Sequence, residues 1–309
     1  MVSKNRRNFC RSCLATAGLS TVPIFGFPAG VTAQTLDLSL GSISSFSDGI
    51  MGLPVDFLYR DVPTAERAPL LAGSINDEGI VNRPVNVTLL KYGKRKVLFD
   101  VGAGLNFLSS LGRLFETLDD ASIDLSEITD VVFTHAHPDH IWGIIDDFDD
   151  LLMPDAAYHI SKDEWAFWDS KNALAMMPAG RENFAVGAKS RFDLLRDRIN
   201  LFSDGEEILP QIEAVNSHGH TPGHMSFVVH DKQSSVLIAG DALTHENISF
   251  QRPDWPSSSD MAPDVAIKSR YKLLERIVHD NLLLAATHLP APGFGRVEKV
   301  QTAWRYVPT

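Results

Sequence analysis

Six consecutive residues at positions 135–140, HAHPDH, place three imidazoles and one carboxylate on a very short stretch of chain. The apolar run at 131–133 predicts a short buried strand, so the six residues fall on a strand-end loop, where functional groups are often placed. Imidazoles and carboxylates bind borderline divalent metals, and these spacings allow two ligands to face one ion and two a second. We predict a metal site rather than a solvated polar loop, because residues of the same kinds recur downstream.

The pattern H-x-H-x-D-H resembles the signature of the metallo-β-lactamase superfamily. Four further stretches match motifs of that family, in the family's order along the chain. They are Asp100-Val101-Gly102, GHTPGH at 219–224, the run 236–239 followed by Gly240-Asp241, and the run 282–286 followed by Thr287-His288. The resemblance covers about residues 36–300. It implies one catalytic domain at 34–309, an α/β sandwich of the αββα type with two mixed sheets and outer helices.

The resemblance also implies roles for individual side chains. Seven are implied to bind two divalent ions: His135, His137 and His220 for one, Asp139, His140 and His288 for the other, and Asp241 as a bridge. Zinc is the default for such ligands, although manganese, cobalt and iron also suit them. Asp139 and Asp241 are thereby implied to act in catalysis, with a metal-bridging hydroxide as the nucleophile. Asp100 and His224 are expected to support the ligands without binding metal.

The first 33 residues have the composition of an export signal. Four basic residues and no acidic residue precede an apolar stretch at 14–31, and Val31-Thr32-Ala33 suits a signal peptidase. The pair Arg6-Arg7 resembles a twin-arginine signal, with an ordinary secretory signal as the alternative. We expect cleavage after residue 33 and a periplasmic or secreted protein.

The net charge of the chain and the positions of its cysteines restrict the expected partners and covalent links. Removing residues 1–33 removes four of the 28 basic residues and none of the 39 acidic ones, so the formal net charge changes from −11 to −15. So acidic a chain disfavours nucleic acid and anionic membranes as partners. No uninterrupted apolar run reaches the roughly 18 residues of a membrane span, so we expect no stable membrane anchor. Both cysteines, Cys10 and Cys13, lie in the signal, which leaves no disulfide or thiolate ligand after cleavage.

Apolar periodicity predicts the elements around the motifs. Strands are expected at 36–40, 85–90, 96–99, 158–160, 211–216, 226–230, 236–240 and 282–286. Helices are expected at 105–118, from 141, after a capping box at Ser161 and Glu164, at 189–198 and at 264–279. Residues 47–80 are expected to be irregular, and we leave open whether they cover the site or form a homodimer contact. Two runs of strands, each followed by helices, indicate two packed sheets.

Differences between subclasses of the family restrict the expected class of substrate. An Asp at position 241 is typical of superfamily hydrolases of thioesters, lactones and phosphoesters, and is generally lacking in the β-lactamases. Homoserine lactonases have a tyrosine three residues later, where this chain has Thr244. The sequence around positions 100–114 and 288–295 looks most like the exported methyl parathion hydrolase group. That group acts on neutral organophosphate triesters, aryl esters and lactones.

An aromatic substrate pocket is expected on the same grounds. Its candidate residues are Phe107, Trp142, Trp165, Trp168, Phe184, Thr244, His245 and Phe250, each weighed against ordinary core packing. Few cationic residues lie near the motifs in sequence, which favours a small, neutral, apolar substrate: a lactone, aryl ester or phosphotriester. The alternatives are a β-lactamase-like or thioester hydrolase, a mononuclear iron oxygenase of the same superfamily, and a protein that only binds a ligand.

Overall fold

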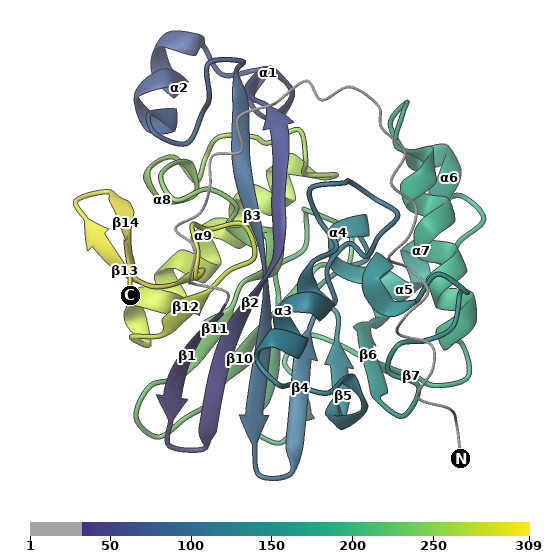
Figure 1. Ribbon diagram of the computed structural model, residues 1–309. Helices are drawn as coiled ribbons and strands as arrows, with labels where there is room; N and C mark the ends of the chain where they lie inside the picture. The colour runs from purple at the N-terminus through teal and green to yellow at the C-terminus, as the bar shows by residue number, and fades with distance from the viewer. Residues whose placement is uncertain (1–32) are drawn as a thin grey trace, which may run out of the picture. The chain divides into compact units, whose positions relative to one another are not determined.

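Two seven-stranded sheets lie face to face in the computed structural model, which describes residues 33–309 (Figure 1). In sheet order, the first consists of β1 (Ala33–Leu38), β2 (Gly41–Pro54), β3 (Ile80–Tyr92), β4 (Arg95–Phe99), β5 (Asp130–Val132), β6 (Ala157–Ser161) and β7 (Ile199–Phe202). The second consists of β14 (Ala303–Pro308), β13 (Phe294–Val300), β12 (Leu283–Ala285), β11 (Val236–Ile238), β10 (Met225–Val229), β9 (Ile212–Asn216) and β8 (Glu207–Leu209). The predicted export signal lies outside the described residues, apart from Ala33.

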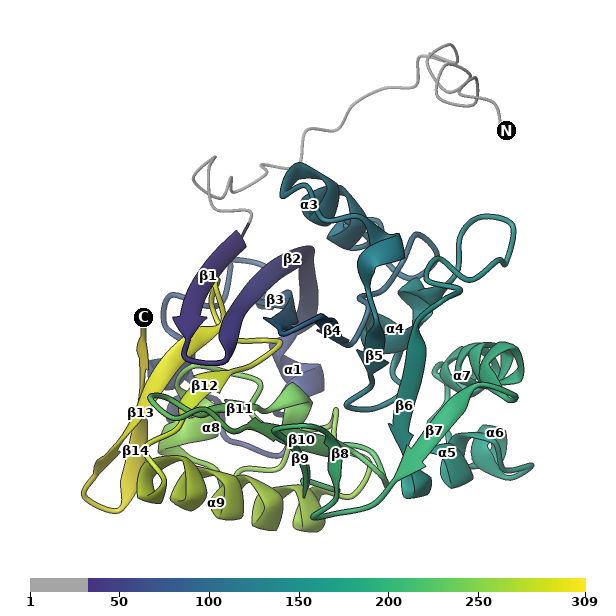
Figure 2. The same cartoon turned by 90° about the horizontal axis from the view of Figure 1, so that it is seen from below.

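Helices cover the outer face of each sheet (Figure 2). The helices in the first half of the chain are α1 (Val55–Leu58), α2 (Thr64–Leu71), α3 (Leu114–Asp120), η2 (Leu125–Glu127), α4 (Pro138–Ile141) and η3 (Trp142–Ile144). Those along the second half are α5 (Lys162–Trp168), α6 (Ala173–Met176), α7 (Glu182–Leu195), η4 (Gly240–Ala242), α8 (Ile248–Gln251) and α9 (Pro263–His279). Among residues 33–309, no helix is long and apolar enough to span a membrane.

Successive side chains of the buried strands point to opposite faces of each sheet. Apolar side chains therefore form three layers, one between the two sheets and one outside each sheet. On β10, Phe227 packs between the two sheets, whereas its neighbour Val228 packs toward α9. On β3, Leu90 likewise faces the second sheet and Leu89 faces α3 and α7. Because both faces of each sheet are covered, these strands read as continuous apolar runs. The predicted αββα sandwich is confirmed.

The predicted helix at 105–118 is wrong in its first half, because α3 begins only at Leu114. Gly104 and Gly112 have positive φ angles of 62° and 84°, which turn the chain where a helix would continue. The buried carboxylate of Asp48 accepts hydrogen bonds from the backbone N–H groups of Ala103, Gly112 and Leu114. Burial raises the pKa of Asp48 to about 6.

The segment 47–80 is more regular than predicted. Strand β2 continues to Pro54 and pairs with β3 at 13 positions. Helices α1 and α2 lie in the connection between the two strands. Leu58, Leu71 and Val81 of this part form an apolar cluster with Trp255 from the second half of the chain. Of the two roles left open for the segment, covering the site is the one that its contacts support, because Phe57 and two β2 residues line the cavity described below.

Candidate metal centre

The predicted ligands lie on four loops that follow β5, β9, β11 and β12. His137 has extended backbone angles, and Pro138 begins the short helix α4, where its missing N–H costs no hydrogen bond. The change from extended to helical backbone turns His137 to one side and His140 to the other. One short loop therefore serves two ligand groups.

The seven side chains form three overlapping groups whose candidate ligand atoms lie within 4.8 Å of one another: His135, His137 and His220; His135, His140 and Asp241; Asp139, His140 and His288. In the first group, Nδ1 of His137 lies 3.0 Å from Nε2 of His135 and 2.9 Å from Nε2 of His220. Asp241 contacts both sides of the cluster. Its Oδ1 lies 3.2 Å from Nε2 of His140, and its Oδ2 lies 3.3 Å from Nε2 of His220.

The chemistry of these atoms fits a pair of divalent ions. His140 Nε2 lies 3.2 Å from Asp241 Oδ1 and 3.5 Å from Asp139 Oδ2, yet these three buried atoms make no hydrogen bond of acceptable geometry among the described residues. Such orphaned atoms are rare in native proteins and call for an explanation such as an ion. Burial and the neighbouring imidazoles lower the pKa of His135 and of His137 well below the usual value, so both rings are neutral and carry free lone pairs. A metal ligand must be in that state.

A family model described as the metallo-beta-lactamase superfamily matches residues 80–296. The chain belongs to this superfamily. No curated protein sequence matches it.

Several solved structures resemble the chain. A hydrolase named AbOPH in the beta lactamase superfamily is 25% identical, with a TM-score of 0.84, covering 90% of this chain and 97% of its own. AidC, a dizinc quorum-quenching lactonase in complex with a product, is 24% identical, with a TM-score of 0.82 and the same coverage. A probable metal-dependent hydrolase from Staphylococcus aureus is 17% identical, with a TM-score of 0.72, covering 89% and 99%. The superfamily and the His/Asp cluster support a metal-dependent hydrolase with a divalent metal centre.

Asp100 and His224 both contact predicted ligand residues. The Asp100 carboxylate lies 2.8 Å from Nδ1 of His140 and accepts hydrogen bonds from the N–H and hydroxyl groups of Thr134. Nε2 of His224 accepts the backbone N–H of Asp241 at 2.9 Å, so the ring proton on Nδ1 faces Ser217 Oγ at 2.8 Å. Burial lowers the pKa of His224 to about 3, so the ring is neutral.

Glu164 ties two ligand loops together, a role that the sequence did not suggest. Its buried carboxylate accepts the N–H groups of Ala136 and Gly223, each at 2.9 Å, and the Thr221 hydroxyl at 2.7 Å. A fourth hydrogen bond comes from Nε1 of Trp168 at 2.6 Å. Half of the predicted capping box is present, since Ser161 accepts the N–H of Glu164. The Glu164 carboxylate, however, holds the loops at 135–140 and 219–224 in register.

Asp260 is a second supporting carboxylate that the sequence did not reveal. Its Oδ1 lies 3.1 Å from Nδ1 of His220, and its Oδ2 accepts a hydrogen bond from Arg270 at 2.9 Å. The contact orients the ring so that Nε2 faces the cluster. No motif surrounds Asp260, so only the fold could reveal its partner.

A cavity of about 120 Å³ opens onto the cluster. It is lined by Met51, Leu53, Phe57, Arg83, Phe107, His137, Asp139, Arg181, Phe184, His220, Asp241 and Ser259. The predicted pocket residues Phe107 and Phe184 are both present, with ring centroids 5.8 Å apart in an edge-to-face arrangement. The cavity thus joins the cluster to an aromatic wall.

The structure places the other four predicted aromatic residues outside the lining. Trp142 packs behind Phe107, with ring centroids 5.6 Å apart. Trp165 stacks on Phe192 at 4.3 Å, and Phe250 is buried beside Tyr306 at 5.5 Å. Trp168 donates its N–H to Glu164, as described above. In each case packing against helices or the second sheet determines which way the ring points.

Thr244 and His245 are likewise absent from the lining. The Thr244 carbonyl contacts Arg83 behind the cavity wall. Nδ1 of His245 accepts the N–H groups of Asn247 and Ile248, and Nε2 lies 2.9 Å from the Ser74 hydroxyl. Burial lowers the pKa of His245 to about 3. Its ring is therefore a neutral link between the segment 47–80 and the loop after Asp241.

The expectation of few cationic groups near the site is wrong. Arg83 and Arg181 both line the cavity, although each is more than 35 residues from the nearest ligand in sequence. Arg83 comes from β3 and Arg181 from the turn before α7. Sequence distance from the motifs is therefore a poor guide to charge in this cavity.

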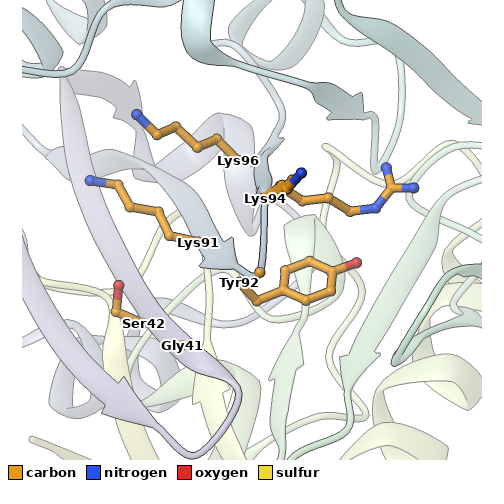
Figure 3. A pocket seen from close by; sticks show the side chains of 8 residues that line it. Gly41, Ser42, Lys91, Tyr92, Lys94 and Lys96 are labelled. Carbon is orange, nitrogen blue, oxygen red and sulfur yellow. The ribbon is translucent and has the colours of Figure 1, made fainter.

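A larger hollow of about 550 Å³ lies elsewhere, at the turns that join β1 to β2 and β3 to β4 (Figure 3). Lys91, Lys94, Arg95 and Lys96 line it, and Arg95 and Lys96 pair with Asp130 and Glu127. None of the clustered histidines or carboxylates lies among its lining residues. The His/Asp cluster opens onto the smaller cavity instead.

Proposed function

We propose that this protein hydrolyses a small lactone or ester, with two divalent ions, zinc by default, held by the seven-residue cluster. The observation that carries the proposal is the convergence of orphaned buried His and Asp atoms at the base of an aromatic-lined cavity. Lactonases among the similar structures support the same bond type. Aryl esters and organophosphate triesters, the substrates of the methyl parathion hydrolase group, are further members of the proposed range.

The residues divide this work between them. His135, His137 and His220 would hold one ion and Asp139, His140 and His288 the other, with Asp241 between the two. When bound, the ions would supply Lewis-acid polarisation of the ester oxygen and would activate a water molecule as the nucleophile near neutral pH. Asp100, His224 and Asp260 hold the imidazoles and the Asp241 loop in place. Phe107 and Phe184 bind the apolar part of the substrate and exclude water.

A panel assay on protein of known metal content tests the proposal. We expect about two divalent ions per chain, measured by elemental analysis, and turnover of a lactone or aryl ester. A phosphotriester, a thioester and a β-lactam complete the panel. Roughly one iron per chain with oxygen consumption would indicate the oxygenase alternative. Two bound ions without turnover of any of the five would overturn the proposed function.

We also propose that the protein is exported through the twin-arginine route and works outside the cytoplasm. The support is the composition of residues 1–33 and the pair Arg6-Arg7. Mass spectrometry of protein from the native host is expected to find a chain that begins near Gln34. Replacing Arg6-Arg7 by Lys-Lys should block export, and an unprocessed cytoplasmic chain would contradict the proposal.

A further inference from the structure

Three arginines are buried in the described part of the chain, and their surroundings differ. Arg67 and Arg270 are 7% and 6% exposed, and each is paired with a carboxylate, Asp56 and Asp260 respectively. Arg270 also donates to the carbonyls of Pro253 and Trp255, at 3.0 and 2.9 Å. Both residues follow the rule that a buried cation is paired and hydrogen-bonded.

Arg83 breaks this rule. It is only 3% exposed, yet no described carboxylate lies within 4.0 Å of its guanidinium nitrogen atoms. Within residues 33–309, its only hydrogen bonds are long ones, from Nε and Nη2 to the Thr244 carbonyl at 3.4 and 3.3 Å. The two carboxylates that share the cavity with it, Asp139 and Asp241, both belong to the metal cluster. Arg83 is therefore a buried cation without a counter-charge, facing the cavity.

A second arginine in the lining of the same cavity, Arg181, also lacks a paired carboxylate among the described residues. The Arg181 guanidinium lies over the Phe57 ring, 4.6 Å from its centroid, and donates to the Ser258 carbonyl at 3.2 Å. No described carboxylate lies within 4.0 Å of it. The formal net charge of the whole chain is −11, so two arginines in one cavity are a local feature. The two carboxylates of the same lining, Asp139 and Asp241, belong to the metal cluster, which leaves the arginines to attract an anion.

We propose that Arg83 anchors an oxyanion group, a carboxylate, that the substrate carries away from the ester bond to be cleaved. The planar guanidinium donates two parallel hydrogen bonds to a carboxylate, and this ligand would provide the missing counter-charge. The inference rests on the proposed function, because the scissile ester would lie at the metal cluster of the same cavity. It changes the expected substrate from a neutral ester to a small ester or lactone with one acidic group, which the Arg181 charge would attract.

Matched substrates and variants test the anchor. The 3- and 4-acetoxybenzoates carry a carboxylate, and the corresponding acetoxybenzamides are neutral and of the same size. We expect the wild type to favour a benzoate at least tenfold in kcat/KM, mainly through KM. Arg83→Gln, whose amide can still donate to Thr244, should raise KM for the benzoate about thirtyfold and change benzamide kinetics less than threefold. Arg83→Lys should fall between the two, and Arg305→Gln, a charge change at an exposed position of β14 outside the lining, should match the wild type.

Calorimetric binding separates the anchor from the hydrolytic function. The probes are 4-hydroxybenzoate and 4-hydroxybenzamide, titrated into metal-loaded wild type and Arg83→Gln of equal metal content and melting temperature. Carboxylate contact with the ions is common to both proteins, so weaker benzoate binding by the variant reports the Arg83 contact. If neither ester is hydrolysed, this loss would support the anchor although the proposed function fails. Equal benzoate binding by the two proteins, or an equal loss of kcat/KM for benzoate and benzamide, would overturn the anchor.

Discussion

The floor and the wall of the cavity are built in different ways. The floor, His137, Asp139, His220 and Asp241, comes from short motif stretches and is braced by buried carboxylates. The wall, formed by the other eight lining residues, comes from segments of the chain that carry no motif. Metal ligands must be held to within fractions of an ångström, whereas an apolar wall needs only to fit its substrate. The comparison predicts that floor changes abolish chemistry and that wall changes alter selectivity.

The largest effect is expected at the centre of the floor. Asp241→Asn should release one metal ion and lower kcat about a thousandfold, because a neutral amide is a poor bridge between two cations. Elemental analysis and kinetics measure both losses, while circular dichroism should show an intact fold. Asp254→Asn, on an exposed carboxylate, is the control. Two ions and near-wild-type turnover in Asp241→Asn would show that Asp241 is no ligand.

The second largest effect is expected at Glu164, whose carboxylate holds two ligand loops together. In Glu164→Gln, the new amide NH₂ would face either the N–H of Gly223 or those of Ala136 and Trp168, which cannot accept a hydrogen bond. Loss of one or two hydrogen bonds should lower the free energy of unfolding by about 2–4 kcal/mol in urea denaturation, because buried donors are left unsatisfied. Metal affinity should fall as well, since the loops at 135–140 and 219–224 lose their common anchor. Glu182→Gln, at an exposed site, should change neither property, and an unchanged unfolding free energy in Glu164→Gln would refute the bracing role.

A smaller effect is expected at Asp260, which contacts the ring of the floor residue His220. Asp260→Asn keeps an oxygen for the His220 ring but removes the charge and leaves Arg270 without its partner. Supporting contacts of this kind are worth about tenfold to a hundredfold in metal affinity. Competition with a chelator measures this loss, and thermal denaturation of the same variant measures any separate loss of stability. An affinity equal to that of the wild type would limit Asp260 to pairing with Arg270.

The smallest effect is expected in the wall. Phe184→Ala should raise KM for aryl esters about fivefold with little change in kcat, because the ring contributes apolar contact and no chemistry. Trp165→Leu is the matched control, since Trp165 stacks on Phe192 away from the lining and should leave KM unchanged. A rise in KM for Trp165→Leu alone would reverse the assignment of the wall.

The amino-acid sequence alone determined the αββα fold and the residues of the floor. Metal binding needs imidazole and carboxylate groups, and HAHPDH, GHTPGH, Gly-Asp and Thr-His remain recognisable because each ligand depends on a short stretch beside a strand. Apolar periodicity located most strands for a similar local reason. It failed at 105–113, where two left-handed glycines and the distant Asp48 carboxylate override a helical pattern.

Only the tertiary structure decided how the site is braced and lined. Glu164, Asp260 and Arg83 contact Ala136, His220 and Thr244, which lie 28, 40 and 161 residues away in sequence. The aromatic candidates show the same limit, because Phe184 faces the cavity and Trp165, from the helix beside it, does not. Residue type and spacing determine what a side chain can bind. The direction in which it points depends on packing between distant segments, which no local pattern encodes.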